Sequence, residues 1–355
     1  MIKVLIGGSP CTYWSVSKKE GREVHAEGEG WELFKNFLIA KEKFQPDFFL
    51  YENNKSTAPE IKEQIKKCLG VWDGTFLMRD SGARYQEINY SLVSAQNRER
   101  LYVHNCGDLP LPKDRNVQID DVLNCGVTNG KHQATGVAVL VGGIKGGKAR
   151  CVTAGYSFKG VLEILKSCAS KDEHKQRFDG VAENQYEVVE ENEGKPTKAI
   201  SKITGKIHDV YPVKDKKILI GEDWYDTELD DGFWLIRKLS VEECCRLQTI
   251  PDDYCRVLSP RQAYKCIGNG WTAEIIIHIL NGALKNVPKE EEIVVLSMYD
   301  GIGTGRYCLD KMGFTNVKYY AYEIDEYAKS VALSNYPDII QKGNAFDVRN
   351  QDIKL

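Results

Sequence analysis

The chain has 355 residues, 42% of them hydrophobic, which is long enough for two domains that each bury a core. Its formal net charge of −3 argues against a globally cationic protein, although a local basic groove suffices to neutralise nucleic-acid phosphates. The 11 cysteines are scattered without a C-x-x-C pair, which favours a reducing compartment. No apolar stretch approaches the length of a membrane span, and no secretory signal is visible, so we expect a cytoplasmic protein.

The first predicted strand ends in a glycine turn that carries a thiol. An apolar run from Val4 to Ile6 is followed by Gly7 and Gly8, and Pro10 then stiffens the backbone just before Cys11. In open α/β sheets, ligands and chemistry gather at the carboxyl ends of strands. A lone cysteine is more often a small buried apolar residue than a nucleophile, so a chemical role for Cys11 depends on supporting residues elsewhere in the chain.

A polar segment, residues 12–30, follows Cys11 and lacks apolar periodicity, which is typical of a mobile loop. One interpretation is a solvated connector. The other is a lid that contacts a phosphate backbone. The side chains that suit such contacts are Ser15, Lys18, Lys19 and Arg22.

A carboxylate follows the second predicted strand. An amphipathic helix over residues 31–38 leads into the apolar run Phe48–Tyr51, which predicts a buried strand that ends at Glu52. Such a carboxylate is either a helix cap or a proton-handling group. One strand-helix-strand unit separates it from Cys11, so both are expected at neighbouring strand ends.

Two arginines precede the next predicted strand, residues 101–103. Arg98 and Arg100 stand two positions apart in an extended segment and therefore project to the same side. On their own they suggest surface charges. Beside a carboxylate and a thiol they suggest a charge clamp.

The strand-helix rhythm is lost from about residue 110 to residue 234, which predicts an irregular, β-rich inserted domain. A strand is expected over 137–141, followed by a flexible basic loop over 142–148. The best candidates for contacts to DNA in this region are Lys145, Lys148 and Arg150.

Regular structure returns near the C-terminus. Ser240 and Glu243 form a capping-box pattern at the start of a helix. A turn is predicted over 268–272, and a buried strand over 293–298 runs into the glycine-rich turn Tyr299–Gly305. The next strand ends at Glu323, about 20 residues on, which is the spacing of nucleotide-binding βαβ units.

In combination, these blocks resemble the cytosine-C5 DNA methyltransferases. The blocks that carry the resemblance are Pro10–Cys11, Glu52–Asn53, Gln96–Arg100 and Tyr299–Gly305. The similarity spans residues 1–110 and 235–355 and is closest to the animal de novo DNA methyltransferases and related phage and bacterial enzymes. It implies an α/β, Rossmann-like fold that uses S-adenosylmethionine and carries an inserted target-recognition domain.

The order of the blocks differs from that of most family members, in which the cofactor blocks come first. Here they follow the block that normally ends the protein, so the chain resembles a circularly permuted member. The implied domains are 1–110 and 236–355, two parts of one catalytic domain, and 111–235 for target recognition. The permutation predicts that strands 4–7 and 294–298 pair in one parallel sheet, with Leu355 near Met1.

The resemblance also implies a covalent mechanism. Cys11 is expected to add to C6 of cytosine. Glu52, as a protonated carboxyl, is expected to hold or protonate N3, while Arg100 with Arg98 stabilises charge at O2. The base must be flipped out of the duplex, and the 12–30 loop is expected to close over it.

The cofactor contacts that the resemblance implies come from both ends of the chain, and no metal is expected. They are Pro10, Asn269, Trp271, Tyr299, Asp300, Gly301, Ile302, Gly303, Glu323 and Ile324. Either Asn344 or Asp347 is expected to contact the adenine. The family usually has an apolar residue after Glu-Asn, where this chain has Asn54–Lys55, which leaves open a modified base or a modified donor.

The resulting hypothesis is a DNA cytosine-C5 methyltransferase that acts as a monomer on double-stranded DNA, in a prokaryotic or phage-infected cell and in the context of restriction-modification. The alternatives are a catalytically silent DNA-binding relative, an RNA cytosine methyltransferase, and transfer of a modified one-carbon group. Retention of Cys11, Glu52 and Arg100 argues against the silent relative.

Overall fold

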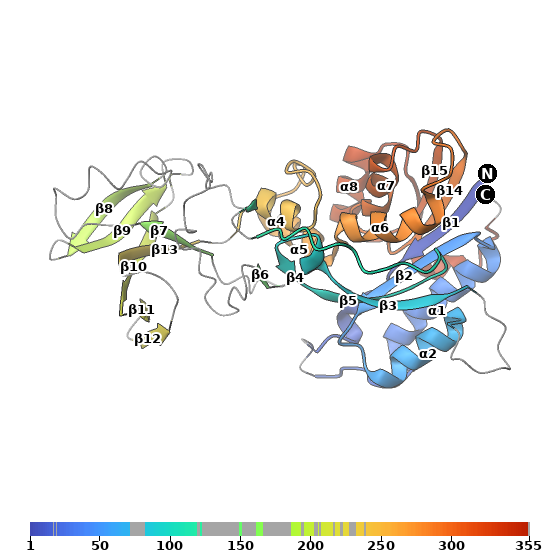
Figure 1. Ribbon diagram of the computed structural model, residues 1–355, viewed down its shortest axis with the longest axis horizontal. Helices are drawn as coiled ribbons and strands as arrows, with labels where there is room; N and C mark the ends of the chain where they lie inside the picture. The colour runs from blue at the N-terminus through green and yellow to red at the C-terminus, as the bar shows by residue number, and fades with distance from the viewer. Residues whose placement is uncertain are drawn as a thin grey trace.

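A seven-stranded, mainly parallel sheet is the centre of the fold in the computed structural model (Figure 1). The structure describes residues 1–16, 18, 20–71, 82–118, 121–122, 149–150, 161–165, 186–192, 195–201, 205, 207–215, 217–220, 223–226, 232–237 and 239–353. Across the sheet the strands are β16 (Ile340–Gly343), β15 (Val317–Tyr322), β14 (Ile293–Met298), β1 (Ile2–Gly7), β2 (Phe48–Asn54), β5 (Glu99–His104) and β3 (Arg84–Asn89). The pairs from β16 to β2 are parallel, and β5 is antiparallel to both of its neighbours.

The direction in which successive strands are added across the sheet reverses between β14 and β1, although these two strands are parallel. From β14 the sheet continues outward to β15 and β16, and from β1 it continues the other way to β2. The two central strands pair from Ile2 opposite Ile293 to Gly7 opposite Met298, which confirms the predicted pairing of strands from opposite ends of the chain. At such a reversal the connections leave the sheet on opposite sides, and a crevice opens at the carboxyl ends of the strands.

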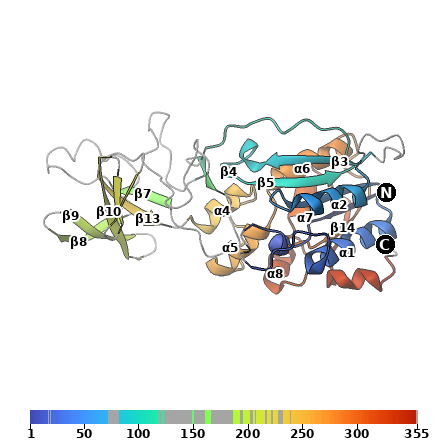
Figure 2. The same cartoon turned by 90° about the horizontal axis from the view of Figure 1, so that it is seen from below.

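Helices cover both faces of the sheet (Figures 1 and 2). One face carries α1 (Gly28–Phe44), α2 (Pro59–Leu69) and the 3-10 helix η5 (Ala345–Arg349). The other carries α4 (Val241–Leu247), α5 (Pro260–Asn269), α6 (Ala273–Leu284), α7 (Thr304–Lys311) and α8 (Glu326–Asn335). Two further 3-10 helices are η1 (Cys11–Tyr13) and η2 (Tyr90–Leu92).

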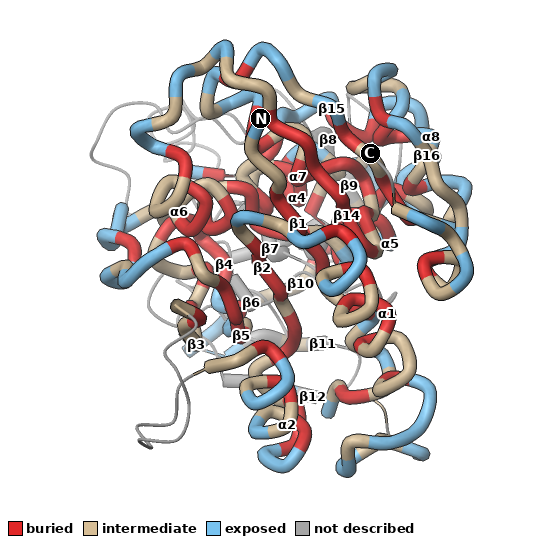
Figure 3. Tube along the Cα trace, turned by 90° about the vertical axis from the view of Figure 1, so that its right-hand side faces the viewer, coloured by how far each residue is buried: buried red, intermediate tan, exposed pale blue. Residues whose placement is uncertain are grey.

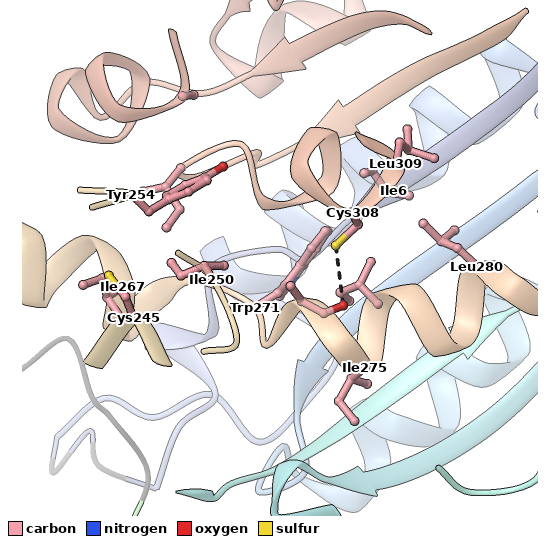
Figure 4. Packing of buried hydrophobic residues seen from close by; sticks show 14 of the residues in the cluster. Ile6, Cys245, Ile250, Tyr254, Ile267, Trp271, Ile275, Leu280, Cys308 and Leu309 are labelled. Carbon is pink, nitrogen blue, oxygen red and sulfur yellow. Dashed lines mark hydrogen bonds between the residues drawn. The ribbon is translucent and has the colours of Figure 1, made fainter. Parts of the chain in front are cut away.

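The core is split into two apolar clusters by the sheet. In β1, Leu5 packs with the α1–α2 side, while Val4 and Ile6 pack with the other side, as the alternation of side chains along a strand requires. Figure 3 shows the buried residues concentrated in the central strands and the helix faces packed on them. Figure 4 shows how Trp271 lies in the larger cluster near Cys308.

A second, antiparallel group of strands lies away from the central sheet in both views (Figures 1 and 2). Its strands are β7 (Val161–Leu165), β8 (Tyr186–Asn192), β9 (Lys195–Ser201), β10 (Ile207–Lys214), β11 (Lys217–Ile220), β12 (Asp223–Asp226) and β13 (Gly232–Arg237). Two short strands, β4 (Gln96–Asn97) and β6 (Ala149–Arg150), form a separate parallel pair. Within the described part of the chain, no helix combines the length and apolarity that a membrane crossing requires.

Three local predictions differ from the structure. The second strand continues through Asn54, beyond the predicted apolar run Phe48–Tyr51, because antiparallel β5 pairs with it as far as Asn54 opposite Arg100. Gly268 and Asn269 belong to the last turn of α5, so the predicted turn starts only at Gly270. The predicted 12–30 loop contains the end of η1 and the first turn of α1.

The predicted capping box at Ser240 is confirmed, because its hydroxyl accepts the backbone N–H of Glu243 and the Glu243 side chain accepts that of Ser240. Other predictions lie outside the described residues. These are the 137–141 strand, the 142–148 loop and Leu355.

Candidate active site

The thiol turn is packed against the end of β2. A side chain at Gly8 would place its Cβ 2.8 Å from Glu52 Oε2 and 2.9 Å from the Glu52 carbonyl oxygen. Gly7 is equally tight against Met298, with only 2.7 Å to its carbonyl oxygen. Neither glycine is among the residues with positive φ, so their role is close approach rather than an unusual backbone conformation.

A buried polar network holds the turn just before Cys11. The Asn53 amide donates to the Ser9 carbonyl at 3.1 Å, to Ser9 Oγ at 3.2 Å and to the Tyr51 hydroxyl at 3.0 Å. Ser9 Oγ and the Tyr51 hydroxyl are 2.8 Å apart. All three side chains are buried. Pro10, whose ring fixes φ near −49°, then leads into Cys11 at the start of η1.

Cys11 lies within the electrostatic reach of all three charged groups that the sequence placed with it. Burial raises the pKa of the Cys11 thiol and is the largest influence on it. Arg100 and Arg98 lower that pKa, and Glu52 raises it. The structure therefore brings the predicted thiol, carboxylate and arginines together at the carboxyl ends of β1 and β2.

The Glu52 carboxylate has a specific partner on each oxygen. Arg100 Nε is 3.1 Å from Oε1, and the Trp271 indole donates to Oε2 over 3.1 Å. The side chains of Glu52 and Arg100 are each only 12% exposed, so water screens their attraction weakly. Trp271, expected at the cofactor, thus contacts the catalytic candidate from the segment between α5 and α6. Sequence spacing gave no signal for this contact.

Lys55 pairs with carboxylates of β3 and β5. Its ammonium lies 3.0 Å from Glu99 and 3.4 Å from Glu87, and its side chain is 40% exposed. Asn54 is buried and lies opposite Arg100, and as the second residue after Glu52 it points to the same side of β2. Of the two residues that depart from the family pattern, only Asn54 lies on the side of the strand that carries Glu52.

The segment after Cys11 is fastened to the protein at several points. Trp14 is completely buried, and its indole donates to Glu23 at 2.9 Å. The other Glu23 oxygen accepts the Gly30 backbone N–H at 3.1 Å. Arg22 donates to the Trp14 carbonyl at 3.1 Å and to the Ser56 carbonyl. Because its guanidinium bridges two loops, Arg22 has a structural task that sequence analysis missed.

The remaining predicted DNA contacts are only partly described. Lys18 lies over the Tyr13 ring with 4.7 Å from its nitrogen to the ring centroid, and the Ser15 backbone N–H donates to the Cys11 carbonyl. Arg150 is described only as backbone in β6. The others lie outside the described residues, namely Lys19, Lys145 and Lys148.

The glycine-rich turn after β14 is held by the carboxylate of Glu323, the residue directly after β15. Glu323 accepts the backbone N–H of Gly301 through Oε2 and those of Ile324 and Asp325 through Oε1, each at 2.8 Å. Gly301 and Gly303 have φ of +64° and +78°, a region that glycine enters without steric cost. A Cβ at Gly301 would meet nothing within 4 Å, so the turn is open on that side.

Asp300 is a buried carboxyl next to this turn. Its Oδ1 accepts the hydroxyls of Ser297 and Tyr319, both at 2.6 Å. Its Oδ2 has no partner among the described residues. Burial raises the pKa of Asp300 to about 6. An unpartnered buried oxygen is costly unless a polar ligand completes it.

The other cofactor candidates occupy varied positions. The Tyr299 hydroxyl donates to the Leu33 carbonyl at 2.8 Å and accepts from Asn36, which ties the turn to α1. Asn344 is exposed and its side-chain oxygen caps η5 by accepting the Phe346 N–H at 2.9 Å. The rest are buried Ile302, half-buried Asp347, exposed Asn269 and Ile324, which is 66% exposed.

Comparison with known proteins gives the family. The model of the C-5 cytosine-specific DNA methylase family matches residues 1–285. The chain belongs to this family. The family match identifies the protein as a DNA cytosine-5 methyltransferase. The match includes the Cys11 turn, Glu52, both arginines and Trp271, but stops before the glycine-rich turn.

A search of solved structures found a protein from E. coli described as a candidate DNA modification methyltransferase encoded within a prophage. It is 16% identical, with a TM-score of 0.38, over 80% of this methyltransferase and 78% of that chain. A similarity at that level supports no further argument. Among curated proteins, no sequence matched.

Proposed function

We propose that this DNA cytosine-5 methyltransferase takes a methyl group from S-adenosylmethionine and places it on C5 of a flipped-out cytosine through a Cys11–C6 adduct. The observation that carries the proposal is the convergence of Cys11, Glu52 and Arg100 at the reversal point of the sheet. A nucleophile, a carboxyl and a cation around one crevice are the groups that addition to a pyrimidine ring needs.

Cys11 acts as the nucleophile that bonds to the base. Its sulfur lone pair forms a bond to C6, and the C5–C6 π electrons move toward N3 and O2, which makes C5 nucleophilic. After C5 has accepted the methyl group, the proton on N3 returns to Glu52. The C5 proton leaves to a solvent base, and the C5–H electrons re-form the C5–C6 double bond. The C6–S bond then breaks, and its electrons return to sulfur. Because C6 is inaccessible inside a stacked duplex, the base must first leave the helix.

Glu52 and Arg100 act on the polar edge of the ring. Glu52 holds N3 and supplies the proton that neutralises it during addition. Arg100, with Arg98 behind it, stabilises the negative charge that develops on O2. Before the base enters, Glu52 is already oriented by Arg100 and Trp271, so little reorganisation is required.

The residues at the glycine-rich turn fit the methyl donor. Bound S-adenosylmethionine supplies an electrophilic methyl group on a sulfonium ion. The open side of Gly301 admits a ligand close to the backbone, and Asp300 Oδ2 offers an acceptor. Glu323, already fixed by three backbone N–H groups, keeps one acceptor site on Oε2 for a ribose hydroxyl. We assign Asp347, whose side-chain oxygen is not used as a cap, to the adenine.

We further propose that the chain is a circular permutation of the usual order and that residues 111–235 recognise the target sequence. The two chain ends approach one another through α1: Lys43 Nζ donates to the Gln351 carbonyl at 3.1 Å, and Lys3 Nζ donates to the neighbouring Phe44 carbonyl at 3.2 Å. Lys3 and Gln351 are thus both held at the same end of α1, and segments in such positions can be joined without displacing the sheet.

Replacement of the nucleophile tests the mechanism. Cys11→Ser is expected to abolish transfer of labelled methyl from S-adenosylmethionine to unmethylated plasmid DNA, because a hydroxyl is a much weaker nucleophile than a thiolate. Binding of the same DNA in a gel-shift assay is expected to remain. Transfer by Cys11→Ser at the wild-type rate would overturn the assignment of the nucleophile.

A rearranged chain tests the permutation. Residues 289–355 would precede residues 1–288 through a short flexible linker, which places the cofactor blocks first. We expect this protein to fold and to transfer methyl groups, because the β14–β1 register does not depend on which strand comes first. Failure to fold, while the same linker is tolerated in a surface loop, would contradict the permutation.

A further inference from the structure

We infer that the Tyr51 hydroxyl positions the Cys11 turn, and that Tyr51 is therefore a positioning residue for methyl transfer. The inference rests on the proposed role of Cys11 as nucleophile. Tyr51 lies in the middle of an apolar strand and was predicted only as core. Its ring does pack as core, with Phe34 and Phe37 edge-on at centroid distances of 5.1 Å each.

Packing in the apolar cluster does not explain why Tyr51 carries a hydroxyl. It lies instead 2.8 Å from Ser9 Oγ and accepts the Asn53 amide at 3.0 Å. Because the oxygen accepts from Asn53, its own proton is available to Ser9 Oγ. A phenylalanine would fill the same apolar space, so the oxygen serves the polar network rather than the packing.

The orientation of the network is fixed independently. Asn53 Oδ1 accepts the backbone N–H of Asn54 at 2.8 Å, which directs the amide nitrogen toward Ser9 and Tyr51. Ser9, Asn53 and Tyr51 are 4%, 1% and 0% exposed, so no water replaces a lost partner at little cost. Ser9 is thereby held at its carbonyl and its hydroxyl, two residues before Cys11.

This attachment matters because Cys11 lies beyond the end of its own strand. β1 ends at Gly7, and only the turn Gly8–Pro10 connects the strand to the nucleophile. Nucleophilic attack requires the sulfur within about 3–3.5 Å of C6, and small misplacements of a reacting group slow a reaction strongly. The Tyr51–Ser9 contact thus fixes the thiol relative to Glu52, which follows Tyr51 directly on β2.

The test compares Tyr51→Phe with Tyr264→Phe. Tyr264, in α5, is a matched control because its hydroxyl also makes a short bond, 2.6 Å, but to the Leu239 carbonyl just before α4 and not to the thiol turn. Single-turnover transfer to unmethylated plasmid DNA and the melting temperature would be measured for both. We expect Tyr51→Phe to slow transfer on the order of tenfold, with unchanged affinity for S-adenosylmethionine and DNA. Tyr264→Phe should transfer at the wild-type rate.

A second readout separates positioning from simple loss of stability. The plasmid would be copied with 5-fluorocytosine. A base cannot remove the C5 fluorine as it removes the C5 proton, so elimination is blocked and the Cys11–C6 adduct accumulates and is seen on a denaturing gel. Adduct formation should slow in Tyr51→Phe to the same extent as transfer. Adding Ser9→Ala to Tyr51→Phe should slow it little further, because the two changes break one network.

The outcomes distinguish the two proposals. Wild-type rates of adduct formation in Tyr51→Phe, with no adduct in Cys11→Ala, would overturn the role of Tyr51 alone. An adduct in Cys11→Ala would overturn the proposed mechanism itself. A loss of rate in Tyr51→Phe that is accompanied by an equal loss in donor affinity would assign Tyr51 to general stability and refute positioning.

Discussion

The two turns that flank the reversal point use glycine in different ways. After β1, Gly7 and Gly8 have ordinary backbone angles and are needed because Met298 and Glu52 leave no space for a side chain. After β14, Gly301 and Gly303 have positive φ, and Gly301 has open space beside it. Tyr299 also has a positive φ, 62°, which is strained for a tyrosine.

The two turns are also fastened differently. Side chains of β2 hold the thiol turn. The glycine-rich turn after β14, the donor turn, is held at its backbone, where Glu323 accepts the Gly301 N–H and the Tyr322 carbonyl accepts that of Asp300. The difference suits their proposed tasks. A nucleophile must be placed accurately by its surroundings, and a donor site must leave its backbone open to a ligand. Changes on the β2 side should therefore alter the rate, and changes on the Glu323 side should alter donor affinity.

The largest expected effect is on the β2 side. Glu52→Gln keeps the shape of the side chain but removes its ionisable proton. We expect transfer to unmethylated plasmid DNA to slow roughly 10²–10⁴-fold, with donor affinity within about twofold of wild type. Single-turnover rates and titration calorimetry would measure the two quantities.

Glu99→Gln is the matched control for Glu52→Gln. Glu99 is also a carboxylate that pairs with a cation, but it is 47% exposed and bound to Lys55 on the far side. Loss of the Glu99 charge should leave the rate of methyl transfer unchanged. If Glu52→Gln weakened donor binding and spared the rate, the division of labour between the two turns would be wrong.

The pH dependence of the unfolding free energy tests the environment of Asp300, next to the donor turn. Its pKa is raised from 3.8 to about 6, so the folded protein binds a proton that the unfolded chain has released. The stabilisation is therefore complete below pH 3.8 and is lost as pH rises through 6. Asp300→Asn carries no such titration. Between pH 3.8 and pH 7.5, wild type should lose about 3 kcal/mol of unfolding free energy relative to Asp300→Asn.

Urea unfolding of ligand-free protein at several pH values would measure this difference. Asp347→Asn is a control, because Asp347 is also an aspartate assigned to the donor site but lies in η5 and is only half-buried. A difference between wild type and Asp300→Asn that stays constant across this pH range would contradict the raised pKa of Asp300.

Glu323→Gln is expected to act on donor binding. The amide lacks the charge and replaces one acceptor with a donor that faces backbone N–H groups. Loss of one charge-assisted contact should weaken S-adenosylmethionine about tenfold, or about 1.4 kcal/mol. Titration calorimetry would check the affinity, and transfer at saturating donor should be slowed less. Unchanged affinity would remove Glu323 from the donor site.

Much of this fold followed from local sequence. The apolar run at residues 4–6 and the Ser240–Glu243 capping box each depend on neighbours in the chain, and both appear in the structure. The pairing of β1 with β14 followed from the order of the family blocks and not from local pattern.

What sequence could not predict depends on tertiary contacts. Nothing local distinguishes Tyr51 from a phenylalanine in an apolar strand, because its partner Ser9 lies 42 residues away. The hydrogen bond from Trp271 to Glu52 spans 219 residues. Arg22 was expected on DNA, yet it bonds to backbone carbonyls that only the folded loop brings near.

The smallest expected effect concerns Lys55, which with Asn54 stands where the family usually has an apolar residue. Its ammonium pairs with Glu99 and Glu87, and its side chain is 40% exposed; exposed pairs contribute no more than about 1 kcal/mol. Lys55→Met should therefore leave the transfer rate unchanged and lower the unfolding free energy by less than about 1 kcal/mol. Asn54→Val is the informative comparison, since Asn54 lies opposite Arg100 on the Glu52 side of β2. A change in rate with Lys55→Met but not with Asn54→Val would show that Lys55 reaches the base pocket and that the two faces of β2 have been assigned in reverse.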